Sequence, residues 1–252
     1  MQLSRPGNEH ALAPTVLYGY GGWNLLPGPY SLAQDGLNRF IEAGGHIVVA
    51  NLRGGGEFGN NWWEDGRRER KQHTFKDYAT VARDLIRREV TSPKHLGALG
   101  RSNGGLLTAA AAVQFPELFR AVVTEVPLTD MARAMLHPYL ASYREEYGDP
   151  EDPEMLPVLL AYSPVHNVQE NVNYPAVFAL AGKDDLRCQP WNARKFVHLI
   201  ANATTSDHPV LMRIAPGGHG GDLTLANRTE RASEVLLFFF TELPFSSPIS
   251  FT

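Results

Sequence analysis

Short apolar runs alternate with longer segments of helical period along most of this chain. Continuous hydrophobicity, in place of strict alternation, is typical of strands buried on both faces of a parallel sheet between two helical layers. The runs rich in Val, Ile or Leu lie at 14–20, 46–52, 95–100, 121–126, 176–182 and 210–215. The segments of helical period lie at about 31–43, 75–89, 103–114, 190–202 and 228–242. The pattern predicts an α/β fold with a mostly parallel sheet of about six strands and helices on both faces.

One domain is expected over residues 1–252. The length of 252 residues and the hydrophobic share of 43% are enough for one large core, and α/β units of this size fold as single domains. Residues 130–173 break the alternation with several prolines and tyrosines. We expect this segment to be an insertion of short helices and loops over one end of the sheet.

Charge and composition exclude several classes of partner. The net charge of −4 and the isoelectric point of about 6.1 provide no field that would gather nucleic acid or an anionic membrane. The only cationic run, "RRERK" at 67–71, is expected to be a solvated surface. A single cysteine, Cys188, excludes an internal disulfide and fits a reducing compartment. No signal sequence or membrane-length apolar run is found, so a cytoplasmic protein is expected.

The stretch "GRSNGG" at 100–105 places one hydroxyl between residues of little bulk. It fits G-x-S-x-G between a strand and a helix, the nucleophile elbow, whose sharp turn raises the serine above the strand ends. Gly100 and Gly104 leave space where a β-carbon would strike a neighbouring segment. The turn also aims the Asn103 N–H at the space beside Ser102, where an oxyanion develops. The alternative is that Ser102 only caps a helix.

A serine nucleophile needs a base and an acid, which in this fold follow in the order Ser, Asp, His. His219 lies in the glycine-rich loop "APGGHGG" after the run at 210–215, and it alone among nine histidines combines this order with a loop after a strand. Asp184 and Asp185 follow the run at 176–182 and compete for the acid. The spacing G-x-x-D from Gly182 favours Asp185.

Two competing motifs are weaker. "GGGEFG" at 54–59 satisfies G-x-G-x-x-G, and Asp77 follows at the distance of a ribose-binding acid. However, "NNWWEDG" comes next, with no amphipathic helix to hold a pyrophosphate. The chain has no metal-binding motif, so Glu145 and Glu146 are expected at the surface, and neither a metal nor a cofactor is expected.

The chain resembles the catalytic domain of the prolyl oligopeptidase family, an α/β-hydrolase fold, over nearly all of its length. The resemblance implies a catalytic triad of Ser102, Asp185 and His219, with Tyr20 and Asn103 as oxyanion donors. It also implies that Arg187 binds a substrate carbonyl. The stretches that carry it are "LYGYGGWN" (17–24), "VVANLRGGGEFG" (48–59), "KQHTFKDY" (71–78), "TSPKHL" (91–96), "GRSNGGLL" (100–107), "YSPVHNV" (162–168), "GKDDLRCQP" (182–190) and "GGHGG" (217–221).

The resemblance also implies a pocket for a proline ring, lined by Trp23, Leu128, Tyr143, Tyr147 and Cys188. Tyr143 stands where the family has the tryptophan that stacks on proline. An aromatic face remains for a pyrrolidine, although a strict preference for proline does not follow. Cys188 is expected on the pocket wall beside a cation, where it would be sensitive to thiol reagents.

The family's β-propeller and first strand pair are expected to have no counterpart, because only thirteen residues precede the run at 14–20. This N-terminally shortened sheet is expected to expose 46–52 as an apolar edge through which the chain self-associates. The resemblance implies a serine peptidase that cleaves after proline or a small apolar residue through an acyl-enzyme, with a peptide or small ester as substrate. An esterase or acyl-peptide hydrolase, or an inactive binding module, is the alternative.

Overall fold

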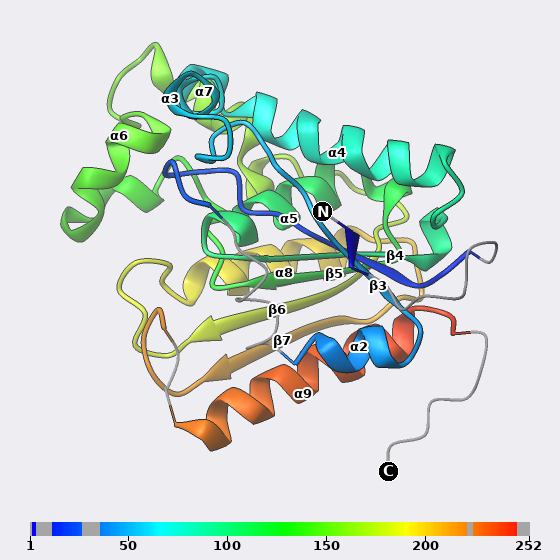
Figure 1. The fold of residues 1–252 in the computed structure, drawn as a ribbon. Coiled ribbons are helices and arrows are strands. Elements are labelled where there is room, and N and C mark those ends of the chain that lie inside the picture. Colours follow the sequence, from blue (N-terminus) through cyan, green and yellow to red (C-terminus); the bar gives the residue numbers. More distant parts are fainter. Residues whose placement is uncertain (1, 4–11, 27–35, 221–223, 246–252) are drawn as a thin grey trace.

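The fold is built around a central β-sheet (Figure 1). The computed structural model describes residues 2–3, 12–26, 36–220 and 224–245. Seven strands of this described part form one sheet in the order β1-β3-β2-β4-β5-β6-β7. Six of them are parallel, which confirms the predicted α/β-hydrolase-type sheet. The strands are β1 (Gln2–Leu3), β2 (Thr15–Tyr18), β3 (His46–Val49), β4 (Leu96–Arg101), β5 (Ala121–Glu125), β6 (Ala176–Gly182) and β7 (Val210–Ala215).

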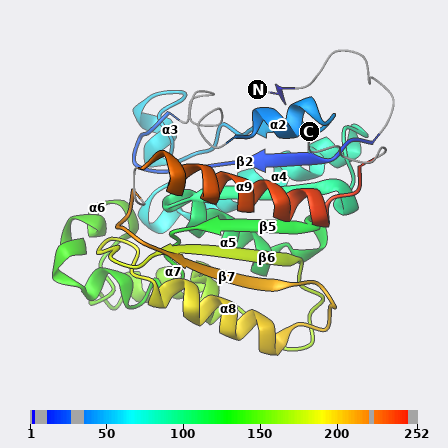
Figure 2. The same cartoon turned by 90° about the horizontal axis from the view of Figure 1, so that it is seen from below.

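Helices cover both faces of this sheet. Figure 1 shows α4 and α5 on one face with α8, and α2 and α9 on the other; Figure 2 shows α9 running along the strands. Each layer seals its own apolar core against the sheet, which is why β5 and β6 are buried throughout. The helices are α2 (Asn38–Glu42), α4 (Gln72–Arg87), α5 (Asn103–Gln114), α8 (Trp191–Ala203) and α9 (Leu225–Glu242). Of the range predicted at 31–43, residues 31–35 lie outside the described residues.

Short elements fill the segment expected as an insertion. Figures 1 and 2 both show α6 at the end toward which the strand arrows point, so this segment stands over the carboxyl edge of the sheet. Its elements are η4 (Ala134–Leu136), η5 (Pro138–Tyr143), α6 (Arg144–Tyr147), α7 (Met155–Tyr162) and η6 (Pro164–His166). The remaining short helices are α3 (Asn60–Glu64), η1 (Arg68–Arg70), η2 (Pro93–His95) and η3 (Pro116–Leu118).

The expectation of an unpaired apolar edge at 46–52 is wrong. Strand β1 pairs antiparallel with β3, Gln2 opposite Val48 and Leu3 opposite Ile47, and every residue of β3 is buried. Two residues near the start of the chain thus supply the backbone partner that β3 needs. Self-association stays a prediction, without the open edge on which it rested.

Two predictions of surface position are also wrong. Lys71, the last residue of "RRERK", and Glu146 are both buried, whereas Arg68 and Glu145 are exposed as expected. Lys71 and Glu146 form an ion pair with each other, and this pairing compensates for the loss of hydration when each charged group is buried. In the part of the chain that the structure describes, no helix combines the length and the apolar character needed to cross a membrane. A cytoplasmic location stays a prediction.

Candidate active site

Ser102 lies on a strained turn between β4 and α5. Its φ of +60° is in the left-handed region, which a residue with a side chain rarely adopts. The turn needs glycine on both sides: a β-carbon on Gly100 would overlap the carbonyl of Gly104, and one on Gly104 would lie 2.5 Å from the Gly19 carbonyl oxygen. A strained backbone conformation therefore holds this hydroxyl above the carboxyl edge of the sheet.

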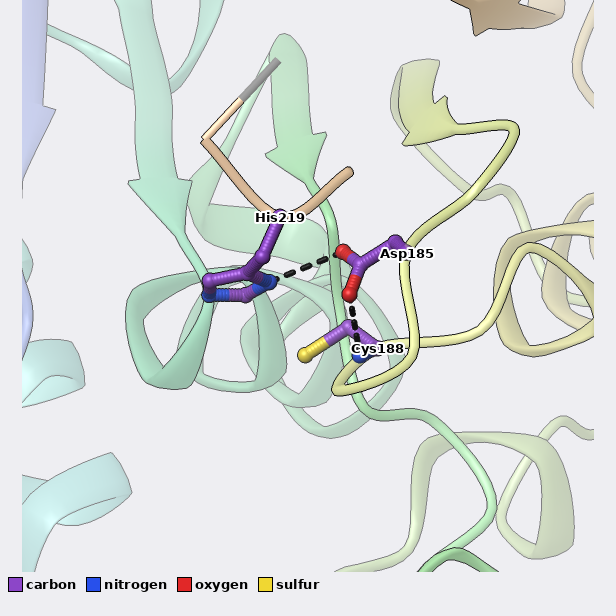
Figure 3. A group of neighbouring side chains, drawn as sticks. All are labelled: Asp185, Cys188 and His219. Atoms are coloured by element: carbon purple, nitrogen blue, oxygen red, sulfur yellow. Dashed lines mark hydrogen bonds and ion pairs between the residues drawn. The ribbon is translucent and has the colours of Figure 1, made fainter. Parts of the chain in front are cut away.

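The side chains of Ser102, His219 and Asp185 meet in series. His219 Nε2 lies 2.9 Å from Ser102 Oγ, and His219 Nδ1 lies 2.8 Å from Asp185 Oδ2. Figure 3 shows the second of these contacts. An imidazole that carries its proton on Nδ1 donates to the carboxylate and accepts the serine proton on Nε2. This geometry can move a proton from the alcohol to the imidazole.

Asp185, the expected acid, accepts two backbone hydrogen bonds. The N–H groups of Arg187 and Cys188 donate to its Oδ1 at 2.8 and 2.9 Å, and Figure 3 shows the contact with Cys188. Burial by itself would raise the pKa of Asp185, but the hydrogen bonds from His219 and from these amides together lower it. The adjacent Asp184 is exposed. Burial and contact with the imidazole thus distinguish the two candidate acids.

The loop that carries His219 is fixed to the turn at Ser102. The guanidinium of Arg101 donates to the His219 carbonyl oxygen over 2.6 Å, and it lies 3.5 Å from buried Glu125. The loops after β6 and β7 also touch, because a β-carbon on Gly182 would lie 2.6 Å from the Gly218 carbonyl oxygen. These contacts bring together side chains that are 117 residues apart in the chain.

The two expected oxyanion donors flank the serine. Burial raises the pKa of the Tyr20 phenol, while a hydrogen bond with the Ser102 side chain lowers it, and the net shift is upward. Tyr20 therefore keeps its proton and remains a donor at neutral pH. Asn103 is buried as the first residue of α5, and its side-chain Nδ2 donates to the Tyr20 carbonyl oxygen. The residues that carry the two donors are thus tied to each other.

A cavity of about 670 Å³ opens beside this site. It contains Trp23, Tyr143 and Arg187 of the predicted substrate residues, and the Trp23 and Tyr143 rings meet edge-on with centroids 4.7 Å apart. Leu128 and Tyr147 do not line it, and both are buried. The lining residues are Tyr18, Tyr20, Trp23, Leu25, Arg101, Ser102, Tyr139, Ser142, Tyr143, Arg187 and His219.

Five of these lining residues were missed from the sequence. Arg101 occupies the unspecified position of G-x-S-x-G, and Tyr139 and Ser142 belong to the irregular insertion. Tyr18 and Leu25 flank the "GYGGWN" stretch without belonging to a chemical motif. Several of these residues lie next to motif residues in the sequence. That proximity does not indicate which side chains point into the cavity.

Cys188, which was expected on the pocket wall, is not among the residues that line the cavity and is almost completely buried. Burial raises the pKa of its thiol well above the ordinary value, which keeps it protonated. Asp185, Cys188 and His219 each bring one potential metal-ligand atom within 4.8 Å of the others (Figure 3). The carboxylate and the imidazole already hydrogen-bond to each other, however, so these donors fit a proton relay better than a metal site.

The competing dinucleotide motif has other contacts. Asp77, the candidate ribose acid, binds the Arg53 guanidinium through two hydrogen bonds of 2.8 and 2.6 Å. The helix after "GGGEFG", α3, has five residues, none of them buried. Both features oppose a pyrophosphate site here.

Comparisons with known proteins indicate the family. The prolyl oligopeptidase family profile matches residues 34–244. The prolyl endopeptidase of Dictyostelium discoideum is 36% identical over 233 residues, which cover 90% of this chain and 30% of the relative. An uncharacterized peptidase of Sinorhizobium fredii is 38% identical over 231 residues, covering 91% and 31%.

Solved structures show the same fold. A structure from a study of two prolyl endopeptidases is 41% identical with a TM-score of 0.88, covering 94% of this chain and 35% of that one. A post-proline cleaving enzyme from Rickettsia typhi is 33% identical with a TM-score of 0.86, covering 98% and 36%. The chain thus spans about a third of the length of the relatives it matches.

Proposed function

Because the chain belongs to the prolyl oligopeptidase family of serine peptidases, we propose that it hydrolyses peptide bonds after proline or a small apolar residue, with Ser102, His219 and Asp185 as its triad. The observation that carries the proposal is the hydrogen-bonded series of alcohol, imidazole and carboxylate at the mouth of a cavity. In relatives named prolyl endopeptidase, a domain like this one forms about a third of the protein.

The proposed reaction passes through an acyl-enzyme. Ser102 Oγ attacks the scissile carbonyl carbon while His219 Nε2 accepts its proton, and Asp185 stabilises the resulting imidazolium. The carbonyl oxygen becomes an oxyanion that the Tyr20 hydroxyl and the Asn103 N–H stabilise. His219 then gives its proton to the leaving amine, and water repeats the sequence to release the acid.

Substrate choice is proposed to rest on the aromatic part of the cavity. The edge-on pair of Trp23 and Tyr143 offers an apolar aromatic surface to a pyrrolidine ring. Arg187 is exposed at the same cavity and is proposed to bind a carbonyl of the peptide. Tyr143 stands where the family has a tryptophan, and its phenol ring offers less surface for stacking than an indole ring. The pocket is therefore proposed to accept small apolar residues as well as proline.

A fluorophosphonate probe tests the nucleophile. The expected result is one covalent label on Ser102 in the folded chain and none on Ser102→Ala; equal labelling of both proteins contradicts the proposal. Rates on an N-blocked prolyl p-nitroanilide and on a short-chain p-nitrophenyl ester then test the substrate class. Reaction with the ester alone would make the protein an esterase, and absence of any label would make it a binding module.

A further inference from the structure

Behind the site lies a buried ion pair that takes no part in the proposed reaction. Lys71 Nζ and Glu146 Oε1 are 2.9 Å apart, and their side chains are 0% and 1% exposed. Lys71 Nζ also donates to the Gly21 carbonyl oxygen over 3.0 Å, and Trp63 Nε1 donates to Glu146 Oε2 over 2.9 Å. The pair therefore joins the segment after β2, the helix α3, the start of α4 and the helix α6.

Two residues at this ion pair, Gly21 and Glu146, are adjacent in sequence to residues near Ser102. Gly21 follows Tyr20, and Glu146 precedes Tyr147. Tyr147 O–H donates to Asn103 Oδ1 over 2.8 Å, and Asn103 Nδ2 donates to the Tyr20 carbonyl oxygen. The contacts thus form a closed ring through both residues that carry the proposed oxyanion donors.

Two further contacts tighten this ring. The Tyr147 ring centroid lies 5.4 Å from Lys71 Nζ, within the range of a cation–π interaction. A β-carbon on Gly22 would lie 2.5 Å from Asn103 Nδ2, so the segment after β2 passes close against the Asn103 amide. The contacts therefore link the position of the ion pair to the positions of Tyr20 and Asn103.

The geometry points to Lys71 and Glu146 as positioning residues that set the separation of the Tyr20 and Asn103 oxyanion donors, an inference that rests on the proposed function. Stability alone explains the pair poorly, because replacing a buried ion pair by apolar residues is often neutral or favourable. Unlike an apolar contact, hydrogen bonds are directional, so those of Lys71 fix the positions of Gly21 and α6 relative to each other. Misplacement of a reacting group by about 1 Å can cost about 100-fold in rate.

Glu146→Gln tests this role in the whole 252-residue chain. The substitution keeps the size of the side chain and leaves Lys71 without its counter-charge. We expect the rate of Ser102 labelling by the fluorophosphonate, measured per folded molecule, to fall about 10- to 100-fold. For the p-nitrophenyl ester, kcat should fall by a similar factor and KM should change far less, because the donors act on the transition state.

The matched control is Glu242→Gln. Glu242 is also a buried acid, and its Oε2 lies 2.9 Å from the Arg120 guanidinium, next to the amino end of β5. This variant should lower the melting temperature while the labelling rate per folded molecule stays that of the wild type. A merely structural role predicts the same behaviour for Glu146→Gln.

A double-mutant cycle with Tyr20→Phe identifies the route of the effect. If the ion pair acts through the donors, Glu146→Gln costs much less in a Tyr20→Phe background than in the wild type. Fully additive losses would overturn the inference. If Glu146→Gln does not fold, the charge-free Lys71→Met/Glu146→Leu chain takes its place, and a folded double variant that reacts at the wild-type rate would also overturn it.

The two levels of proposal fail in different ways. A wild-type chain that never labels at Ser102 removes the proposed function and this inference with it. A wild-type chain that labels normally, beside a Glu146→Gln chain that labels equally fast, removes only the positioning role.

Discussion

Within the described residues, serine, histidine and aspartate side chains lie together in two clusters. In the first, His219 lies between Ser102 and Asp185 with contacts of 2.9 and 2.8 Å. In the second, at the insertion, Ser163 Oγ lies 2.8 Å from His166 Nδ1, and His166 Nε2 is 3.9 Å from Asp130 Oδ1. The same three residue types therefore come together twice.

The difference lies in what surrounds each group. Ser163 is completely buried, donates to the Thr129 carbonyl oxygen and accepts from the Met131 N–H, so its hydroxyl joins two segments of backbone. Asp130 binds Lys195 at 2.7 Å and Arg133 at 3.2 Å, which neutralise it with fixed cations. Residue composition therefore does not distinguish the two clusters. Ser102, the proposed nucleophile, differs from Ser163 in its strained turn, its open cavity and the direct contact of its histidine with an aspartate.

Serine-to-alanine substitutions should separate the clusters most strongly. Ser102→Ala is expected to lower kcat for the prolyl p-nitroanilide or the ester by about 10⁴- to 10⁶-fold, because the nucleophile is lost. Ser163→Ala should leave kcat within about twofold and lower the free energy of unfolding by about 1–3 kcal/mol, since it removes the side-chain acceptor of the buried Met131 N–H. Steady-state kinetics and urea denaturation measure the two effects. A large loss of activity in folded Ser163→Ala would end the distinction.

Tyr20→Phe tests a second difference between the clusters. The Tyr20 hydroxyl forms a hydrogen bond with the Ser102 side chain, whereas the described contacts of the Ser163 hydroxyl include no tyrosine. Removing one oxyanion donor is expected to lower kcat about 100- to 1000-fold with a small change in KM. Tyr174→Phe is the matched control: its buried hydroxyl donates to the Gln169 carbonyl oxygen, away from the cavity. The control should lose stability and keep its kcat. Equal kcat losses in both variants would contradict the role of Tyr20.

The smallest expected effect is a pH dependence of stability from Asp185. Its pKa is lowered in the folded protein, so its stabilisation is complete above the unfolded value of about 3.9 and is lost as pH falls through the folded value. Between pH 6 and 3, the wild type should therefore lose stability more steeply than Asp185→Asn. Asp184→Asn, at the exposed neighbour, should follow the wild type. Urea denaturation across this range decides, and parallel curves for the wild type and Asp185→Asn would refute the assignment.

Local sequence carried much of the fold and of the site. The elbow at Ser102 follows from the small residues around it, because only glycine at 100 and 104 allows the close backbone contacts of that turn. The parallel sheet follows from continuous apolar runs, whose pattern is written in consecutive residues. The order of Ser102, Asp185 and His219 along the chain is likewise a property of the sequence.

Other features depend on partners far away in the chain. The sequence places Lys71 in a charged run and Glu146 in an acidic pair. Neither pattern shows that these two residues, 75 positions apart in the chain, form a buried contact. Arg101 gives no sign of its contact with the His219 carbonyl oxygen 118 residues later. The pairing of β1 with β3 was missed because two residues are too short for a strand pattern.

By itself, then, the sequence determined the sheet, the turn at Ser102 and the candidates for acid and base, because glycine sterics and hydrophobic periodicity act over a few residues. The spacing from Gly182 already favoured Asp185 over Asp184, and the structure places Asp185 in contact with the imidazole. Only the tertiary structure decided that Ser163 joins two backbone segments and that Lys71 and Glu146 are buried. Whether a charge is solvated or paired depends on which distant group shares its surroundings, and folding alone brings those groups together.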